Sequence, residues 1–206
     1  QIAALPFMES PEARALRDAR WPAAARRFES LIPRIEPLLS GAPMALAPAE
    51  IEALRQCAPR WMALVEEIAR GGVPASLEHG DLRASNIRLT AEGIIFFDWA
   101  FASVAHPFLS MAGLLHCHRA WLFDRPEWRD SIRDAYLELW TGFGPMDRLR
   151  RLFEQVDRCK ALHYALADAE WARAVWERLD WRRPADWSAD AWTLERRQFY
   201  LAKTLR

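Results

Sequence analysis

The chain has 206 residues, a length that suits one domain or one large lobe of a two-lobed protein. Hydrophobic residues make up 51% of the sequence and charged residues 27%, which predicts a packed core and argues against a disordered chain. Lys plus Arg and Asp plus Glu both total 28, so the basic excess of a general nucleic-acid binder is missing. We therefore expect no nucleic-acid partner.

The cysteines and the apolar segments bear on the compartment. Cys57, Cys117 and Cys159 are far apart and show no CxxC spacing, which predicts reduced thiols in a cytoplasmic protein. No apolar run reaches the roughly 18 residues of a membrane helix. The first ten residues lack the basic region of a signal peptide. We expect neither a membrane span nor a membrane partner.

The first third of the sequence has helical periodicity. Ser10 as N-cap and Pro11 as first helical residue predict a helix over 11–20. A second helix is expected over 22–39, with kinks at its internal prolines, and a small-residue linker follows over 41–48. A third is expected over 48–69, because its apolar residues recur at helical spacing: Ile51, Leu54, Trp61, Leu64, Val65 and Ile68.

The helical period is lost between Pro74 and Trp99. Two short apolar runs, 86–89 and 94–97, are joined by 90–93, a pattern typical of a β-hairpin. Helical patterns return after Pro107, and they predict helices over 108–123, 126–141, 146–178 and 189–203. The sequence thus predicts an α+β fold that is mostly helical and contains one small hairpin.

Polar residues cluster around this hairpin. Asp81 follows Gly80 in a loop, Asn86 begins the first strand, and Asp98 ends the second. Because a hairpin brings its two ends together, we expect Asn86 and Asp98 to face the same small volume. A few oxygen ligands of this kind suit Mg²⁺, which keeps waters and completes its shell with phosphate oxygens.

The same residues resemble a known family. His79-Gly80-Asp81, with Asn86 five residues after the aspartate, is similar to the catalytic loop of aminoglycoside phosphotransferases and choline kinase-like enzymes. Protein kinases share this loop in variant form. Phe97-Asp98-Trp99 resembles the metal-binding segment of these enzymes, 12 residues after Asn86. The resemblance extends from Leu77 to about Leu115 and implies a protein kinase-like C-terminal lobe with a short hairpin at its active site.

The resemblance also implies roles and a reaction. Asp81 would be catalytic and would accept or orient the proton of an attacking hydroxyl, while His79 would support the loop. Asn86 and Asp98 would hold Mg²⁺ against the phosphates of ATP. The implied function is a kinase, a transferase of the ATP γ-phosphate to a hydroxyl of a small molecule. The sequence does not choose among acceptors such as aminoglycosides, choline or amino sugars, and it gives no oligomeric state.

This resemblance predicts one C-lobe-like domain over 1–206. It divides into a helical lead-in (1–73), the catalytic loop and metal hairpin (74–101) and C-terminal helices (102–206). The β-rich N-terminal lobe that covers ATP in the family is not evident, and no lysine precedes Lys160. Nucleotide-binding residues are therefore not identified. We expect the chain to be a fragment of a longer protein, and the alternatives are a truncated gene product or a degenerate relative that transfers nothing. Ser110 stands where the family often has an aspartate, which we interpret as a structural position.

Other residues allow a second interpretation. His116 and His118 lie two apart on a predicted helix, so they face different ways, and we expect no zinc site there. The tryptophans of the C-terminal half fit helix packing. Alternatively they form an aromatic wall for a sugar or a cationic amine, with Asp168, Glu170 and Trp171 as candidate acceptor-binding residues.

Two rival functions stay open. One is a non-catalytic pseudo-phosphotransferase that binds a ligand or partner. The other is a hydrolase with Asp81 as nucleophile or base. The hydrolase ranks last, because the further Asp and Lys residues usual around such a nucleophile are absent from the sequence near it.

Overall fold

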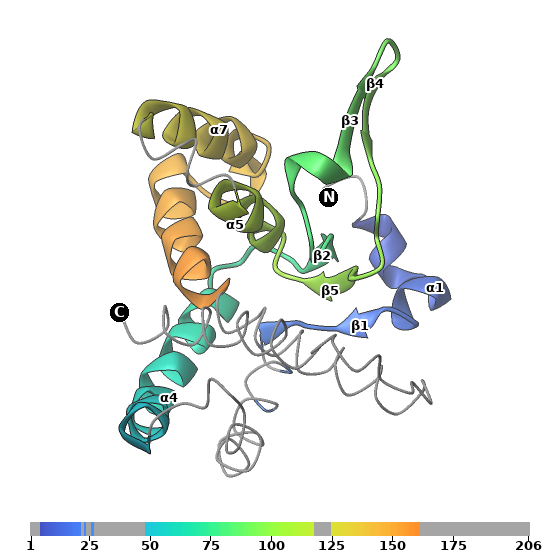
Figure 1. Cartoon of the computed structure of the whole chain (residues 1–206). Coiled ribbons are helices and arrows are strands. Elements are labelled where there is room, and N and C mark those ends of the chain that lie inside the picture. The colour runs from blue at the N-terminus through green and yellow to red at the C-terminus, as the bar shows by residue number, and fades with distance from the viewer. Residues whose placement is uncertain (1–4, 22, 24–25, 27–47, 118–124, 161–206) are drawn as a thin grey trace, which may run out of the picture. The chain divides into compact units, whose positions relative to one another are not determined.

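A computed structural model describes residues 5–21, 23, 26, 48–117 and 125–160 (Figure 1). The chain forms two compact units, one of Gln1–Ala23 with Glu66–Lys160 and the other of Ala24–Val65 with Ala161–Arg206. All residues of the predicted catalytic loop and hairpin belong to the first unit. The helices expected over 22–39 and 189–203, and the linker over 41–48, lie mostly or wholly outside the described residues.

Helix α4 (Pro48–Ala69) has the bounds that the apolar spacing predicts. Trp61, Val65 and Ile68 are buried along one side of it, at intervals of four and three residues. Gly72 follows the helix with a φ of 73°, a conformation that glycine adopts without strain and that commonly ends helices.

The first sheet has three strands, in the order β1 (Arg17–Asp18), β5 (Ser103–Ala105), β2 (Ser76–Glu78). Strand β1 pairs with β5 in parallel, and β2 pairs with β5 in antiparallel register, which places Glu78 opposite Ser103. Both side chains are fully buried. The sheet thus fixes a carboxyl group and a hydroxyl beside each other, immediately before His79.

The second sheet is the predicted hairpin. It follows a 3₁₀ turn, η4 (Ala84–Asn86), and pairs β3 (Ile87–Thr90) with β4 (Gly93–Phe96). Thr90 faces Gly93 across a two-residue loop, and Gly93 has a φ of 138°, in the region that favours glycine. Figure 1 shows the hairpin running away from the three-stranded sheet, which agrees with its exposed apolar side chains: Leu89 is 77% and Ile94 58% exposed.

The helical core surrounds Phe108, the first residue of α5 (Phe108–Cys117). Its ring lies edge-on to Tyr136 on α7 (Pro126–Glu138) and to Trp140, with both centroids at 5.9 Å, and it contacts Phe153 at 6.0 Å. A 3₁₀ turn, η5 (Thr141–Phe143), leads to the next helix, described over 146–160. Edge-to-face aromatic packing adds to the stability that burial provides. Several aliphatic side chains complete this core: Leu109, Leu137, Leu149, Leu152 and Val156.

None of the helices that the structure describes has the length and apolar character required to cross a bilayer.

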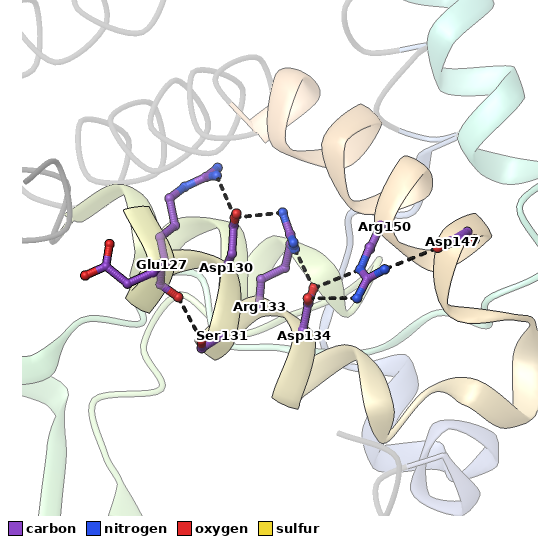
Figure 2. Close-up of polar contacts among 8 residues, drawn as sticks. Glu127, Asp130, Ser131, Arg133, Asp134, Asp147 and Arg150 are labelled. Atoms are coloured by element: carbon purple, nitrogen blue, oxygen red, sulfur yellow. Dashed lines mark hydrogen bonds and ion pairs between the residues drawn. The ribbon is translucent and has the colours of Figure 1, made fainter. Parts of the chain in front are cut away.

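Charged side chains connect α7 to the helix over 146–160 (Figure 2). The carboxylate of Asp134 accepts hydrogen bonds from Arg133 Nε at 2.8 Å and from Arg150 at 3.3 and 3.0 Å. Arg150 also pairs with Asp147 at 3.2 Å. The hydrogen bonds from Arg133 and then from Arg150 hold the pKa of Asp134 below its ordinary value. Asp134 therefore favours folding most when it is ionised.

A buried histidine follows β5. His106 Nδ1 accepts a hydrogen bond from Phe108 N at 3.2 Å, so Nε2 carries the proton in the neutral ring. Nε2 is buried and has no hydrogen-bond partner among the described residues. Burial lowers the pKa of His106 to about 3, because the interior disfavours the charged ring.

Three expectations from the sequence were wrong in detail. The helix expected over 11–20 is shorter in the structure, where α1 spans only Pro11–Arg14 and follows a 3₁₀ turn, η2 (Pro6–Glu9). Ser10 caps α1 as predicted, because its side chain accepts from Ala13 N at 3.2 Å. The chain leaves the helix at Ala15 and continues into β1, where the carboxylate of Asp18 accepts from Arg20 N at 3.1 Å and from the Arg20 guanidinium.

The second correction concerns the three-stranded sheet, because the sequence predicted no strands other than those of the hairpin. Strands of two or three residues are too short to show alternation. As a result, the lead-in 1–73 contains β1 and the segment 102–206 begins with β5, so neither is purely helical. The third correction is the helix expected over 126–141, where α7 ends at Glu138 and the chain turns into η5.

We predict that His106 makes folding pH-dependent. Its pKa is lower in the folded chain than in the unfolded one, so the unfolded chain binds more protons between about pH 6.5 and pH 3. Stability should fall as pH decreases through this window, by up to about 1.4 kcal/mol per pH unit. Urea unfolding of the wild type and His106→Leu between pH 7 and pH 4 measures this slope. Equal slopes in the two proteins would contradict the prediction.

We predict a second, more acidic transition from Asp134. Asp134→Asn should lower the free energy of unfolding at pH 7 by only about 0.5–1 kcal/mol, because the ion pairs of Asp134 with Arg133 and Arg150 are partly exposed and screened by solvent. Because the folded pKa of Asp134 is depressed, its contribution is present above about pH 4 and is lost as pH falls through the folded value. Asp147→Asn is the control, because Asp147 also pairs with Arg150 but is 80% exposed, and it should change stability little.

Candidate active site

The loop from His79 to Asp81 is fixed by hydrogen bonds from three consecutive backbone amides to side chains. His79 N donates to Ser110 Oγ at 3.1 Å, Gly80 N to Glu78 Oε1 at 2.8 Å, and Asp81 N to His79 Nδ1 at 3.3 Å. No amide of this segment depends on water for its partner. The path of the backbone into Asp81 is therefore set by buried groups, as a catalytic loop requires.

Gly80 has a φ of 81°, which glycine adopts readily and other residues rarely do. A Cβ on Gly80 would also lie 2.3 Å from the carbonyl oxygen of Phe101 and 2.6 Å from its Cβ. The loop consequently requires glycine for two reasons, its backbone conformation and the close approach of the chain after the hairpin.

His79 forms hydrogen bonds through both of its ring nitrogens. Its Nδ1 accepts from Asp81 N, so Nε2 carries the proton and donates to the carbonyl oxygen of Phe97 at 3.0 Å. The ring also packs against Trp99, with centroids 4.5 Å apart. His79 is 2% exposed. It thus connects the loop before Asp81 to the residues on both sides of Asp98.

Asp81 and Asn86 are in direct contact. Asn86 Nδ2 donates to the backbone oxygen of Asp81 at 2.9 Å and to its Oδ2 at 3.3 Å. The Asn86 side chain is buried, whereas the Asp81 side chain is 16% exposed, so its carboxylate is accessible at one side. The two residues that the motif separates by five positions are brought together by the η4 turn.

Asp98 is brought to the same end of the hairpin. Phe97 N donates to the backbone oxygen of Asn86 at 3.1 Å, which extends the β3–β4 ladder to the residue before Asp98. Asp98 has a φ of 63° and is the one non-glycine residue of the described part of the chain with a positive φ. Aspartate tolerates this conformation better than most residues, but it still costs free energy. Such strain is common at functional sites.

The oxygens of Asn86 and Asp98 suit Mg²⁺. The amide nitrogen of Asn86 is engaged by Asp81, which orients the amide oxygen away from that contact. Asp98 is exposed to solvent. Two oxygen ligands, one of them anionic, leave positions for water and phosphate, as Mg²⁺ sites on nucleotides do. No group of three or more His, Cys, Asp or Glu side chains in the described segments forms a rival metal site.

Two residues of the site were not identified from the sequence. Arg83 places a guanidinium nitrogen 3.0 Å from Asp81 Oδ2, and its side chain is 47% exposed. Glu78 is fully buried and bonds the loop at Gly80. Their sequence signals are an arginine two residues after the aspartate and a carboxyl group at the end of an apolar strand, and neither is distinctive alone.

Asp168, Glu170 and Trp171, together with His118, lie outside the described residues. Their grouping stays a prediction of the sequence.

We predict that Gly80→Ala destabilises the chain and weakens the site. The positive φ should cost about 1–2 kcal/mol and the clash with Phe101 about 1–3 kcal/mol more. Gly93→Ala is the matched control, because Gly93 also has a positive φ but a Cβ there meets nothing within 4 Å. Urea unfolding of both variants measures the difference, and equal losses would show that the approach of Phe101 is unimportant.

Comparisons with known proteins address the whole chain. No curated protein matches it. Among solved structures, an ethanolamine kinase from Plasmodium vivax matches 89% of this chain with 15% identity and a TM-score of 0.49. The match covers 48% of that kinase, so the chain spans about half its length.

A family model provides the clearest assignment. The model of the phosphotransferase enzyme family (APH) matches residues 2–150, which include the loop at Asp81 and both ends of the hairpin. The match extends over well more than half of the sequence and confirms the resemblance that the motifs indicate. The chain belongs to the phosphotransferase enzyme family.

Proposed function

We propose that this chain is the C-terminal, catalytic part of a kinase that transfers the γ-phosphoryl group of ATP to a hydroxyl of a small molecule. The observation that carries the proposal is the contact of Asp81 with Asn86 at the foot of a hairpin whose other strand leads to Asp98. A proton acceptor and two oxygen ligands for a cation then lie within one short loop and hairpin, as phosphoryl transfer requires.

Asp81 acts on the acceptor in this proposal. Its backbone is held by His79 and Asn86, while its carboxylate is partly exposed. A carboxylate in this setting orients an incoming hydroxyl and takes its proton as the oxygen attacks phosphorus. Positioning supplies most of the rate in such reactions, so the rigidity of the loop matters as much as the carboxylate itself.

Asn86 and Asp98 would hold the cation. When bound, Mg²⁺ would neutralise charge on the phosphate oxygens of ATP. The Asn86 amide is oriented by Asp81, and Asp98 is turned by its positive φ. The Asn86 amide is thus oriented by a side-chain contact and Asp98 by its backbone conformation.

Arg83 forms an ion pair with the proposed base. The Arg83 side chain is 47% exposed while it pairs with Asp81, so its guanidinium can also face a phosphate. Arginine binds phosphate through several donors at once and stays charged throughout. We assign it to neutralising charge on the transferred phosphoryl group beside Asp81.

The acceptor is a small molecule with a hydroxyl. The aromatic and acidic candidates Asp168, Glu170 and Trp171 remain proposed acceptor-binding residues, and nothing favours an aminoglycoside over another amine or sugar. The non-catalytic alternative, a pseudo-phosphotransferase, shares the fold and differs in its failure to turn over. A phosphate-transfer assay separates the two.

Two isosteric substitutions test the proposed roles. Asp98→Asn keeps the size and the tolerance of a positive φ but removes the charge, so Mg²⁺-ATP affinity should fall by about tenfold or more. Asp81→Asn should leave that affinity within about threefold and lower turnover by about 10²–10⁴-fold. Calorimetry with Mg²⁺-ATP and a phosphate-transfer assay over small hydroxyl compounds measure the two effects.

The two variants act as controls for each other. Unchanged Mg²⁺-ATP binding in Asp98→Asn would refute the metal assignment. Binding that depends on Asp98 without any turnover would favour the pseudo-phosphotransferase. These measurements should use the chain and also the longest natural protein that contains it.

A further inference from the structure

A buried carboxyl group lies directly beneath the loop of Asp81. Glu78 ends β2, is 0% exposed, and accepts hydrogen bonds at both of its oxygens. Oε1 accepts from Gly80 N at 2.8 Å and from Ser110 Oγ at 3.4 Å, and Oε2 accepts from Ser103 Oγ at 3.3 Å. Burying a carboxyl group is costly unless its oxygens are hydrogen-bonded, and here three donors meet that requirement, one of them an amide of the catalytic loop.

Ser110 links the carboxyl group of Glu78 to a second backbone amide, that of His79. Its hydroxyl has one proton and accepts from His79 N at 3.1 Å, so the proton is directed to Glu78 Oε1. Glu78 therefore holds Gly80 directly and His79 through Ser110. These are the two residues that immediately precede Asp81.

The hydrogen bonds that begin at Glu78 and Ser110 continue to residues beyond Asp81. The ring of His79 bonds the carbonyl of Phe97, next to Asp98, and the backbone oxygen of Asp81 accepts from Asn86. A displacement of the His79 and Gly80 amides would therefore move the proposed base and the support of the proposed metal ligand together. Ser103, in contrast, bonds Glu78 from the side of β5, and the amides of His79, Gly80 and Asp81 donate to other side chains.

We propose that Glu78, acting with Ser110, is the positioning residue of the catalytic loop. This inference rests on the proposed function, because it concerns the placement of Asp81 for phosphoryl transfer. Ser110 occupies the position on α5 at which the family often has an aspartate. In this chain the carboxyl group comes from β2, and a serine on α5 relays it.

The two serines provide a matched comparison. Ser110→Ala and Ser103→Ala each remove one buried hydroxyl that bonds Glu78, but only Ser110 also bonds a loop amide. Ser110→Ala should raise the hydrogen-exchange rate of the His79 and Gly80 amides by about tenfold or more, and Ser103→Ala should change it less than about threefold. Amide exchange is measured by NMR on the chain without nucleotide, so this readout does not depend on activity.

Kinetics separate positioning from a merely structural role. Ser110→Ala should lower kcat by about tenfold or more and leave the KM for Mg²⁺-ATP within about twofold, because Asp81 is displaced while the nucleotide contacts remain. Ser103→Ala should keep kcat within about twofold. Equal effects of the two serine variants on exchange and on kcat would overturn the proposal.

An exchange of the carboxyl position completes the test. Glu78→Ala should lose amide protection and kcat, and Glu78→Ala combined with Ser110→Asp should recover at least about tenfold of each loss. A double variant no better than Glu78→Ala would contradict the proposal. If the wild type neither binds Mg²⁺-ATP nor transfers phosphate, the proposed function fails, and the exchange measurements still decide whether Glu78 and Ser110 hold the loop.

Discussion

The hydrogen bond from His79 Nε2 to the carbonyl of Phe97 is the constraint on which the site depends. It joins two segments that are separated by the whole hairpin, one leading to Asp81 and the other to Asp98. Its direction is set by the other ring nitrogen, which accepts from Asp81 N and so places the proton on Nε2. A single neutral histidine thereby fixes the register between the proposed base and the proposed metal ligand.

Maintaining this arrangement requires features that cost stability. Asp98 has a positive φ, and Glu78 is a carboxyl group without exposure to solvent. The hairpin also leaves Leu89 and Ile94 exposed. The aromatic core around Phe108, built from α5, α7 and the following helix, offsets these costs by burial. The rigid helical body and the strained polar loop are thus parts of one arrangement.

The sequence predicted those parts of the fold that carry periodic or local signals. Helix α4 shows an apolar stripe over many turns, and the hairpin shows two apolar runs around Gly93, so both were placed closely. The strands β1, β2 and β5 were missed because two or three residues show no period, and their pairing joins segments far apart in sequence. The helix predicted over 11–20 ended at Arg14, and the residues after it joined β1, whose pairing with β5 a local pattern does not reveal.

The site shows the same division. The sequence placed Asp81 in a loop and predicted that Asn86 and Asp98 face the same volume, and in the structure Asp81 contacts both His79 and Asn86. Glu78 escaped prediction because its partner Ser110 is 32 residues away, and only the fold brings them together. The loop requires acceptors for two consecutive amides, and Glu78 on β2 and Ser110 on α5 supply them together. A motif that follows single positions along the chain does not detect such a pair, because its members come from different elements and meet only in the folded structure.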